Sequence, residues 1–201
     1  MSVVTFFKQW LQNPRRTGAI VPSSRALARR MVKDLDFSRP RVVIELGSGT
    51  GVFSAELWER MGNRGKLVLV ERNEDLASHL RERFLDAVVI CDCVSNLSTH
   101  LEQLNIHEVD YIVSGLPWTL FPPELQERGL EQVRGSLRPG GVFVTFIYLH
   151  GMRFFNLGAR FEQRLRAVLG RIEKSSPVWA NLPPARVWTW RNGTSANTYL
   201  H

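Results

Sequence analysis

The sequence predicts an α/β fold, in which a central and mostly parallel sheet of seven strands is covered by helices on both faces. Three observations lead to this prediction. An apolar, β-branched run at 42–46 enters a glycine-rich turn and then a plausible helix at 53–61. Strand-like and helix-like runs alternate from there to residue 148, which is typical of a parallel sheet. Acidic residues close the second and third strand-like runs, at the edge where such sheets bind ligands.

Residues 1–41 are expected to form a helical membrane or cap segment in front of a sheet domain at 42–201, within one domain overall. Residues 2–12 predict an amphipathic helix that Asn13-Pro14 ends and two arginines follow; its apolar face holds Val3, Phe6, Phe7, Trp10 and Leu11. This helix fits either a membrane interface or docking on the domain, and its aromatic bulk favours the membrane. A second helix is expected at 25–35, capped by Ser23-Ser24.

The other elements follow in alternating order. Strands are predicted at 42–46, 66–71, 87–92, 109–114 and 142–148, and helices at 53–61, 74–85, 97–104 and 124–137. Residues 138–141, Arg-Pro-Gly-Gly, predict a turn that no helix continues. Strands from 171 to 178 or 179 and at 186–190 are expected to close the sheet as a hairpin-like pair.

The glycines at 47, 49 and 51 alternate, unlike those of a dinucleotide fingerprint, and Glu45 precedes them by two positions. This loop resembles the E/DxGxGxG loop of class I S-adenosylmethionine (SAM) methyltransferases, a Rossmann-like fold. The resemblance implies SAM as cofactor, with Glu71 on the ribose and Asp92 on the adenine amino group. The full set of expected cofactor residues is Ser23, Glu45, Gly47, Ser48, Gly49, Gly51, Glu71, Arg72, Asp92, Cys93 and Ser114. The alternative is an ordinary α/β domain with acids at strand ends.

Residues 114–118, Ser-Gly-Leu-Pro-Trp, follow the fourth predicted strand. Amino-methyltransferases of this fold carry a [D/N/S]-P-P-[Y/F/W]-type motif at that position. A side-chain oxygen and main-chain carbonyls on a rigid turn can orient an amine, and an aromatic ring can face a cation or a base. Serine replaces the usual Asp or Asn and Gly-Leu replaces one proline, which makes a nucleobase amine a less secure substrate. The alternative is a structural loop with a buried tryptophan.

Taken together, five segments resemble the bacterial phospholipid N-methyltransferases over nearly the whole chain: 6–14, 18–24, 45–53, 114–118 and 181–188. The resemblance implies stepwise N-methylation of phosphatidylethanolamine toward phosphatidylcholine. The implied catalytic residues are Ser114, Leu116, Trp118, Tyr148 and Arg186, with Arg186 anchoring the phosphate and Arg153 as second candidate. The same motifs resemble the rRNA adenine dimethyltransferases, so a nucleic-acid adenine amino-methyltransferase is one alternative. A non-catalytic SAM- or membrane-binding protein is the other.

Charge is distributed unevenly along the 201 residues, whose formal net charge is +7. Residues 1–41 hold nine Lys or Arg against two acids, 42–149 nine against fifteen, and 150–201 eight against two. Basic ends favour an anionic partner, either nucleic acid or a membrane surface, and the resemblance to lipid enzymes implies an anionic membrane surface, with nucleic acid disfavoured. No signal peptide or bilayer-spanning run is evident. With that resemblance, we expect a peripheral protein on the inner face of the cytoplasmic membrane, as a monomer and without a metal. Cys91 and Cys93 are expected to be buried thiols.

Overall fold

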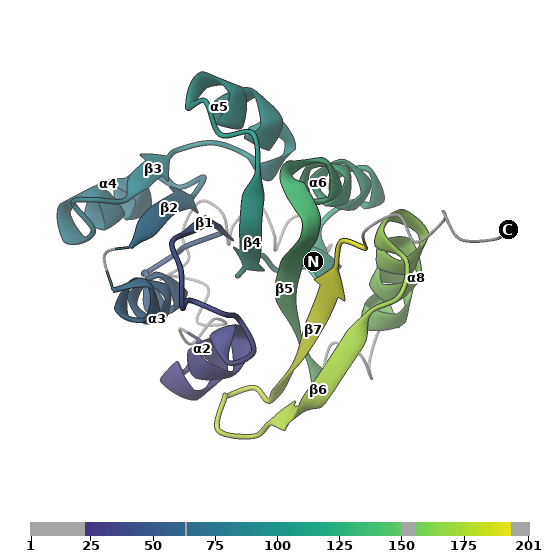
Figure 1. Ribbon diagram of the computed structural model, residues 1–201. Helices are drawn as coiled ribbons and strands as arrows, with labels where there is room; N and C mark the ends of the chain where they lie inside the picture. Colours follow the sequence, from purple (N-terminus) through teal and green to yellow (C-terminus); the bar gives the residue numbers. More distant parts are fainter. Residues whose placement is uncertain (1–22, 63, 150–155, 194–201) are drawn as a thin grey trace, which may run out of the picture.

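The structure is a computed structural model that describes residues 23–62, 64–149 and 156–193. Seven strands form one sheet in the order β3-β2-β1-β4-β5-β7-β6, and Figure 1 shows helices on both sides of it. The predicted α/β fold with a mostly parallel, seven-stranded sheet is confirmed. The amphipathic helix expected at 2–12 lies outside the described residues.

Five strands run parallel to one another, and one strand is inserted against their direction. The parallel strands are β1 (Arg41–Leu46), β2 (Gly65–Val70), β3 (Val88–Ile90), β4 (Val109–Ser114) and β5 (Leu137–Tyr148). β7 (Ala185–Arg191) lies antiparallel between β5 and β6 (Glu173–Val178), which confirms the predicted hairpin. The chain reverses its winding between β1 and β4, the point where doubly wound sheets bind ligands.

In the described part of the chain, helices cover both faces of the sheet (Figure 1). α2 (Arg25–Val32), α3 (Val52–Met61) and α4 (Glu74–Arg83) pack on one face. α5 (Leu97–Gln103), α6 (Pro123–Ser136) and α8 (Leu157–Leu169) pack on the other, together with the short 3₁₀ turns η1 (Val94–Asn96) and η2 (Trp118–Leu120). Because side chains alternate along each strand, successive core residues of β4 reach opposite faces: Tyr111 and Val113 contact the α2–α4 layer, and Ile112 contacts the α5–α8 layer.

α2 is an integral part of the core. Ser24 caps it as predicted, and its hydroxyl oxygen accepts a hydrogen bond from the amide of Leu27 at 3.1 Å. Its buried side chains join the hydrophobic cluster of β1 and α3; they are Leu27, Ala28, Met31 and Val32. Residues from Arg25 onward therefore pack against the sheet domain that was expected to begin at 42.

Two elements differ from the prediction. β5 begins at Leu137, so the expected turn at 138–141 belongs to the strand; the amide of Gly140, at φ +76°, donates to the Asn192 carbonyl at 2.7 Å. Hydrogen bonds to Asn192, just after β7, extend β5 toward its amino end. β3 has only three residues, so Cys91 and Cys93 follow the strand and are half-buried and unpaired. The expectation that both thiols are buried was wrong.

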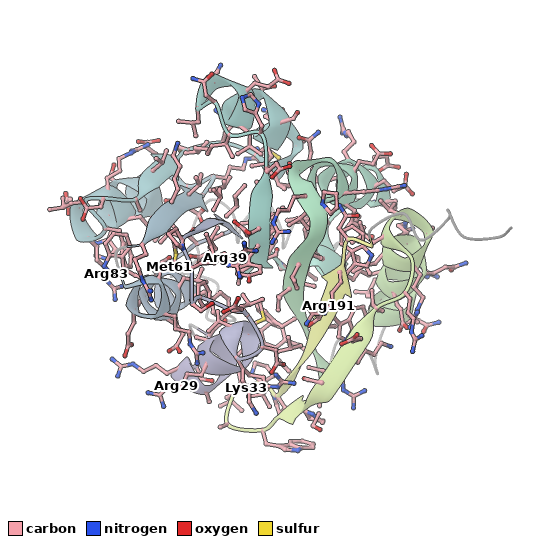
Figure 2. The ribbon with its side chains drawn as sticks, viewed as in Figure 1. Arg29, Lys33, Arg39, Met61, Arg83 and Arg191 are labelled. Carbon is pink, nitrogen blue, oxygen red and sulfur yellow. The ribbon has the colours of Figure 1, made fainter. Side chains whose placement is uncertain are left out.

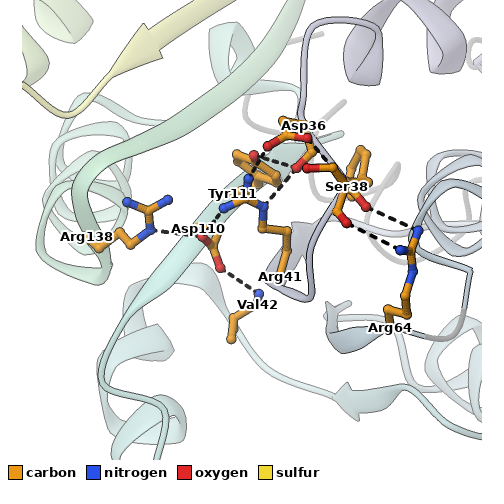
Figure 3. Close-up of polar contacts among 9 residues, drawn as sticks. Asp36, Ser38, Arg41, Val42, Arg64, Asp110, Tyr111 and Arg138 are labelled. Atoms are coloured by element: carbon orange, nitrogen blue, oxygen red, sulfur yellow. Dashed lines mark hydrogen bonds and ion pairs between the residues drawn. The ribbon is translucent and has the colours of Figure 1, made fainter.

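An ionic network around the buried Arg41 side chain ties the amino ends of β1, β4 and β5 together (Figure 3). The Arg41 guanidinium, which is buried, contacts the carboxylates of Asp110, at 3.2 Å, and of Asp36. Asp110 also accepts from the Val42 amide at 2.8 Å and from Arg138 at 2.9 Å. Burial opposes ionisation of Asp110, but these donors outweigh it and its pKa is lowered. This network lies at the sheet edge opposite to the carboxyl ends of the strands.

Candidate functional site

The expected cofactor residues gather at the carboxyl edge of the parallel strands. The glycine loop follows β1, Glu71 follows β2, Asp92 comes two residues after β3, and Ser114 ends β4. The strand register brings these ends side by side, because Leu46 pairs with both Val70 and Ser114. One edge thus holds the loops to which the sequence assigned the cofactor and the acceptor.

The glycine loop has a backbone conformation that other residues rarely adopt. Gly47, Gly49 and Gly51 have φ values of +73°, +54° and +80°. The amide of Gly47 donates to the Val70 carbonyl at 2.8 Å, so the loop is fixed to β2. A Cβ atom added at Gly49 would meet nothing within 4 Å, which leaves its main chain open to a ligand.

Glu45 is a fully buried acid on β1. Neither of its carboxylate oxygens forms a hydrogen bond of normal geometry with any residue that the structure describes. Burial raises the pKa of Glu45 to about 8; the Glu71 carboxylate adds to the rise, and nearby Ser54 opposes it. A buried acid without a cation favours an ammonium ligand that would restore its ionised form. The methionine part of SAM carries such an ammonium.

Glu71 is held by two backbone amides. One carboxylate oxygen accepts from Gly49 at 2.8 Å and the other from Asn73 at 2.9 Å. Each oxygen retains a second acceptor site, which suits a pair of ribose hydroxyls. The carboxylate therefore joins the end of β2 to the middle of the glycine loop.

Asp92 is surrounded by donors from the segment that follows it. It accepts from the Cys93 amide at 2.6 Å, from the Asn96 amide group at 3.1 Å, and contacts His100 Nε2 at 2.7 Å. The His100 hydrogen bond, with those of Cys93 and Asn96, lowers the pKa of Asp92 to about 2. Sequence reasoning missed His100 and Asn96, although their spacing of eight and four residues along η1 and α5 is a usable signal. Binding of adenine by Asp92 stays a prediction.

The remaining cofactor candidates occupy less specific positions. Arg72 is exposed, and its carbonyl accepts from the Cys91 thiol at 3.6 Å. Cys93 is half-buried and packs against the α5–α8 layer. Ser48 is buried in the glycine loop, and no described residue pairs with its hydroxyl oxygen.

In the loop after β4, Ser114 and Trp118 bind each other. The Ser114 hydroxyl oxygen accepts from the Trp118 indole N–H at 2.9 Å and from the Leu116 amide at 3.3 Å. Trp118 is fully buried and stacks on Phe161 of α8, with 5.8 Å between the ring centroids. Phe161 stacks in turn on Trp188 of β7, with 6.1 Å between the centroids. Trp118 therefore packs inside the protein and holds the loop in place, as in the alternative of a structural loop with a buried tryptophan.

The glycine loop and the loop after β4 are in direct contact. A Cβ atom on Gly47 would come within 2.6 Å of the Leu116 side chain, and one on Gly115 within 2.7 Å of the Gly47 carbonyl oxygen. Gly115 needs glycine because the Gly47 backbone approaches it so closely, and Gly47 needs it because its φ is +73°. A group bound at one loop is thereby brought next to a group bound at the other.

A second cluster extends the same edge toward β7. The Ser24 amide donates to the Asn181 side-chain oxygen at 2.8 Å, a contact across 157 positions of sequence. The Leu149 amide donates to the Pro184 carbonyl at 2.9 Å. Tyr148 hydrogen-bonds Ser23; burial raises the pKa of Tyr148 and this bond opposes the rise. Ser23 and Ser24, from the first of the segments that carried the family resemblance, thus contact β5 and the loop at 181–184.

The catalytic candidates divide between the two faces of the sheet. Alternation places Tyr148 toward the α2–α4 layer, and Ser114 and Arg186 toward the α5–α8 layer, where Arg186 pairs in register with Ile147. The guanidinium Nε of Arg186 is buried, and none of the described residues accepts a hydrogen bond from it. Arg153 lies outside the described residues.

Within 23–62, 64–149 and 156–193, no three His, Cys, Asp or Glu side chains are grouped as a metal ion would require. In the same ranges, no helix combines the length and the apolar character needed to cross a membrane.

Comparisons with known proteins agree with this geometry. A family described as a methyltransferase domain matches residues 43–141. The chain is 34% identical over 141 residues to an ornithine lipid N-methyltransferase of Singulisphaera acidiphila, covering 69% of this chain and 73% of that protein.

Solved structures share the fold at low identity. An N1-methyltransferase of 1,6-didemethyltoxoflavin from Burkholderia thailandensis aligns with a TM-score of 0.66 at 17% identity, over 96% of this chain and 88% of the other. A SAM-dependent O-methyltransferase from Thermotoga maritima aligns with a TM-score of 0.64 at 18% identity, over 98% and 73%. Because these names include both a nitrogen and an oxygen acceptor, the fold alone does not identify the acceptor.

Proposed function

The chain belongs to the class I SAM-dependent methyltransferases, and from this premise we propose that it methylates the primary amine of a membrane-lipid headgroup. SAM is the cofactor of this family and S-adenosylhomocysteine (SAH) its product. The lipid acceptor is supported by the 34% identical lipid N-methyltransferase and by the edge that joins Ser24 to Asn181.

The residues present fit SAM in three chemical respects. Buried Glu45 suits the ammonium of the methionine part, and Glu71 suits the ribose hydroxyls. Gly51 offers no side chain to cap α3, so the first-turn amides of that helix suit the carboxylate. When bound, the cofactor supplies an electrophilic methyl group on a sulfonium.

The loop after β4 positions the acceptor amine. The Ser114 hydroxyl oxygen already accepts two hydrogen bonds from within the loop. We therefore propose that the Gly115 carbonyl oxygen, to which no described residue donates, accepts the hydrogen bond from the substrate amine. Leu116, pressed against Gly47, sets the distance between the loops. An alkyl ammonium must lose a proton before attack, and a dry site beside a positive charge lowers its pKa. Tyr148 remains a candidate to face methylated, cationic products.

Arg186 is the observation that carries the lipid assignment. Its buried Nε, from which no described residue accepts, lies on the same sheet face as Ser114 and suits an anionic acceptor. A lipid headgroup that places an anion near a primary amine supplies both groups at once. Phosphatidylethanolamine has a phosphate there, and it is the substrate we propose, with phosphatidylcholine as the end product.

A second candidate substrate follows from the relative's name. An ornithine headgroup places a carboxylate near its amine, and Arg186 can bind a carboxylate as well as a phosphate. The two lipids therefore share the recognition chemistry and differ in the anion.

We further propose that the protein acts as a monomer at the inner, anionic surface of the cytoplasmic membrane, through the segment at 2–16 and other basic segments. A chain lacking residues 1–13 should still bind SAH but sediment poorly with anionic vesicles. Full vesicle binding by the truncated chain, together with a collapsed melting temperature, would show that this segment docks on the domain instead.

The substrate test measures methyl transfer from radiolabelled SAM to four acceptors in parallel: phosphatidylethanolamine vesicles, ornithine-lipid vesicles, phosphatidylcholine vesicles and ribosomal RNA. We expect label in one or both amine lipids and none in phosphatidylcholine, whose nitrogen is fully methylated. Label only in RNA would overturn the proposal. In an Arg186→Ala chain the KM for the amine lipid should rise at least tenfold, since the anion loses a charged partner.

A further inference from the structure

The loop between β6 and β7 exposes two large apolar side chains. We call residues 179–184 the hairpin tip. Among the described residues, three large hydrophobic side chains are exposed: Trp179 and Leu182, each at 72%, and Leu85 at 84%. Single exposed apolar residues are common, but two within four positions of one short loop form a patch.

The fold itself holds the hairpin tip in this conformation. Asn181, between the two apolar residues, is only 2% exposed. Its side chain accepts from the Ser24 amide at 2.8 Å and donates to the Pro183 carbonyl at 2.7 Å. The Pro184 carbonyl accepts from Leu149 at 2.9 Å. Because the polar residue is anchored inward, its apolar neighbours point outward.

The hairpin tip belongs to the carboxyl edge of the sheet. Val178 and Tyr148 both pair with Ala185, and Thr145 of β5 pairs with Ser114 of β4. In Figure 1 the loop projects beyond the sheet beside α2. The exposed patch therefore lies on the edge of the molecule where the acceptor loop opens.

The chain around the hairpin tip is basic. Of the residues that the structure describes there, neither 23–33 nor 174–193 includes an Asp or a Glu. Arg25 is exposed and follows Ser24, which the tip contacts. Arg29 and Lys33 project from the outer side of α2 (Figure 2), although Arg29 also lies 3.8 Å from Glu56. An apolar patch bordered by cations matches the charge of an anionic bilayer.

We propose that the hairpin tip inserts Trp179 and Leu182 into the interfacial layer of an anionic bilayer and so presents the acceptor loop to lipid headgroups. A tryptophan prefers this layer, because its ring is apolar and its N–H meets water. The inference rests on the proposed lipid function. It adds a membrane contact on the described fold that is separate from the segment at 2–16.

The test uses the full chain and vesicles of phosphatidylethanolamine and phosphatidylglycerol. Trp179→Ser with Leu182→Ser should weaken co-sedimentation roughly tenfold or more, because two apolar side chains no longer leave water. Leu85→Ser is the matched control, since it removes an exposed leucine away from the tip, and should sediment like the wild type. SAH affinity and melting temperature should be unchanged in both variants. Turnover of a short-chain, monomeric amine lipid should survive in the double variant while turnover on vesicles falls.

The possible failures are distinguishable. If the double variant binds vesicles and turns over lipid like Leu85→Ser, the hairpin tip is not a membrane contact. If the wild type is dimeric and the double variant monomeric with unchanged vesicle binding, the patch serves a second copy and the inference is overturned. If even the wild type methylates no amine lipid, the proposed function fails, whereas the co-sedimentation comparison still decides the role of the tip.

Discussion

At the scale of single residues, the site depends on buried polar groups that have no hydrogen-bond partner among the described residues, and on one open backbone position. Within the described part of the chain, neither the Glu45 carboxylate nor the buried Arg186 Nε has a hydrogen-bond partner, and Gly49 is a backbone position open on one side. The two unpaired groups cost the folded chain free energy, which a ligand of matching chemistry removes. Glu45 and Gly49 are tested most simply with SAH, which needs no acceptor.

Glu45 makes stability fall as pH rises. Its folded pKa of about 8 exceeds its unfolded value of 4.5, so its contribution is fully present below pH 4.5 and is lost as pH rises toward 8. Glu45→Gln without ligand should therefore be more stable than the wild type at pH 8 and similar at pH 4.5. The expected loss in the wild type is up to about 1.4 kcal/mol per pH unit within this window. Denaturant unfolding at both pH values measures it, and equal pH dependence in both proteins would contradict it.

The same acid predicts that SAH binds more tightly as pH rises. Binding of the SAH ammonium favours ionised Glu45, so a proton leaves on binding below pH 8. Calorimetry should show the wild-type affinity rising between pH 6 and pH 8 by up to roughly tenfold per unit. In Glu45→Gln the affinity should be weak and nearly independent of pH; a steep rise in that variant would place the ammonium elsewhere.

Gly49→Ala should abolish SAH binding without unusual damage to the fold. The control is Gly62→Ala at the end of α3, since the two glycines have φ values of +54° and +55° and neither has an atom closer than 4.0 Å to an added Cβ. Left-handed backbone should cost each variant about 1 kcal/mol. Only Gly49→Ala should lose measurable SAH affinity. Equal affinities in the two variants would mean that no ligand approaches Gly49.

At the scale of elements, a column of aromatic rings supports the acceptor loop. Trp118, Phe161 and Trp188 stack in sequence from that loop through α8 to β7, and the Lys174 ammonium of β6 caps the column 4.8 Å from the Trp188 ring. The acceptor loop is thereby tied to the hairpin that carries Arg186. The position of the loop follows from packing, with the Ser114–Trp118 hydrogen bond setting its orientation.

Trp118→Phe should keep SAH affinity and lose most lipid turnover, because the stack remains but Ser114 loses its indole donor. The stability loss should be about 1 kcal/mol beyond that of the control. Trp188→Phe is that control: its ring lies in the same column, but among the described residues its N–H has no acceptor. Wild-type turnover in Trp118→Phe would show that the bond does not position the loop.

At the scale of the whole molecule, the two edges of the sheet have different tasks. Ion pairs among Arg41, Asp110 and Arg138 hold the amino edge together. The carboxyl edge holds the loops beside buried polar groups that form no hydrogen bond with the described residues. The ion pairs of the amino edge therefore lie away from the loops that would hold the cofactor and the acceptor. Mutations at the two edges should therefore separate stability from binding.

Asp110→Asn should destabilise the protein by about 3 kcal/mol, since the Arg41 guanidinium, 4% exposed, loses its buried partner. For a chain of this size that corresponds to a fall in melting temperature of roughly 6–12 °C. Asp34→Asn, which breaks an exposed pair with Arg30, should cost under about 1 kcal/mol. SAH affinity should be unchanged in both, and a weaker affinity in Asp110→Asn would couple the two edges.

Local patterns in the sequence were sufficient for the sheet, the glycine loop and the closing hairpin, because each is encoded within a dozen neighbouring residues. They were insufficient for Trp118, whose burial depends on Phe161, 43 positions away, and for the bond between Ser24 and Asn181. The role of Arg41 was equally hidden, since a buried pair with Asp110 has no local signature. A single sequence shows which residues are present but not which distant residues pair.

The central claim is that the methyl group reaches a headgroup nitrogen, and ¹³C-methyl SAM tests this most directly. The full chain is incubated with vesicles of phosphatidylethanolamine, ornithine lipid and phosphatidylglycerol, and the extracted lipid is examined by NMR and mass spectrometry. The account predicts a new N-methyl carbon signal and a mass gain of one or more methyl groups in an amine lipid, both absent with Gly49→Ala. Label on carbon or oxygen, or no label in the lipid while SAH accumulates with RNA, would contradict it.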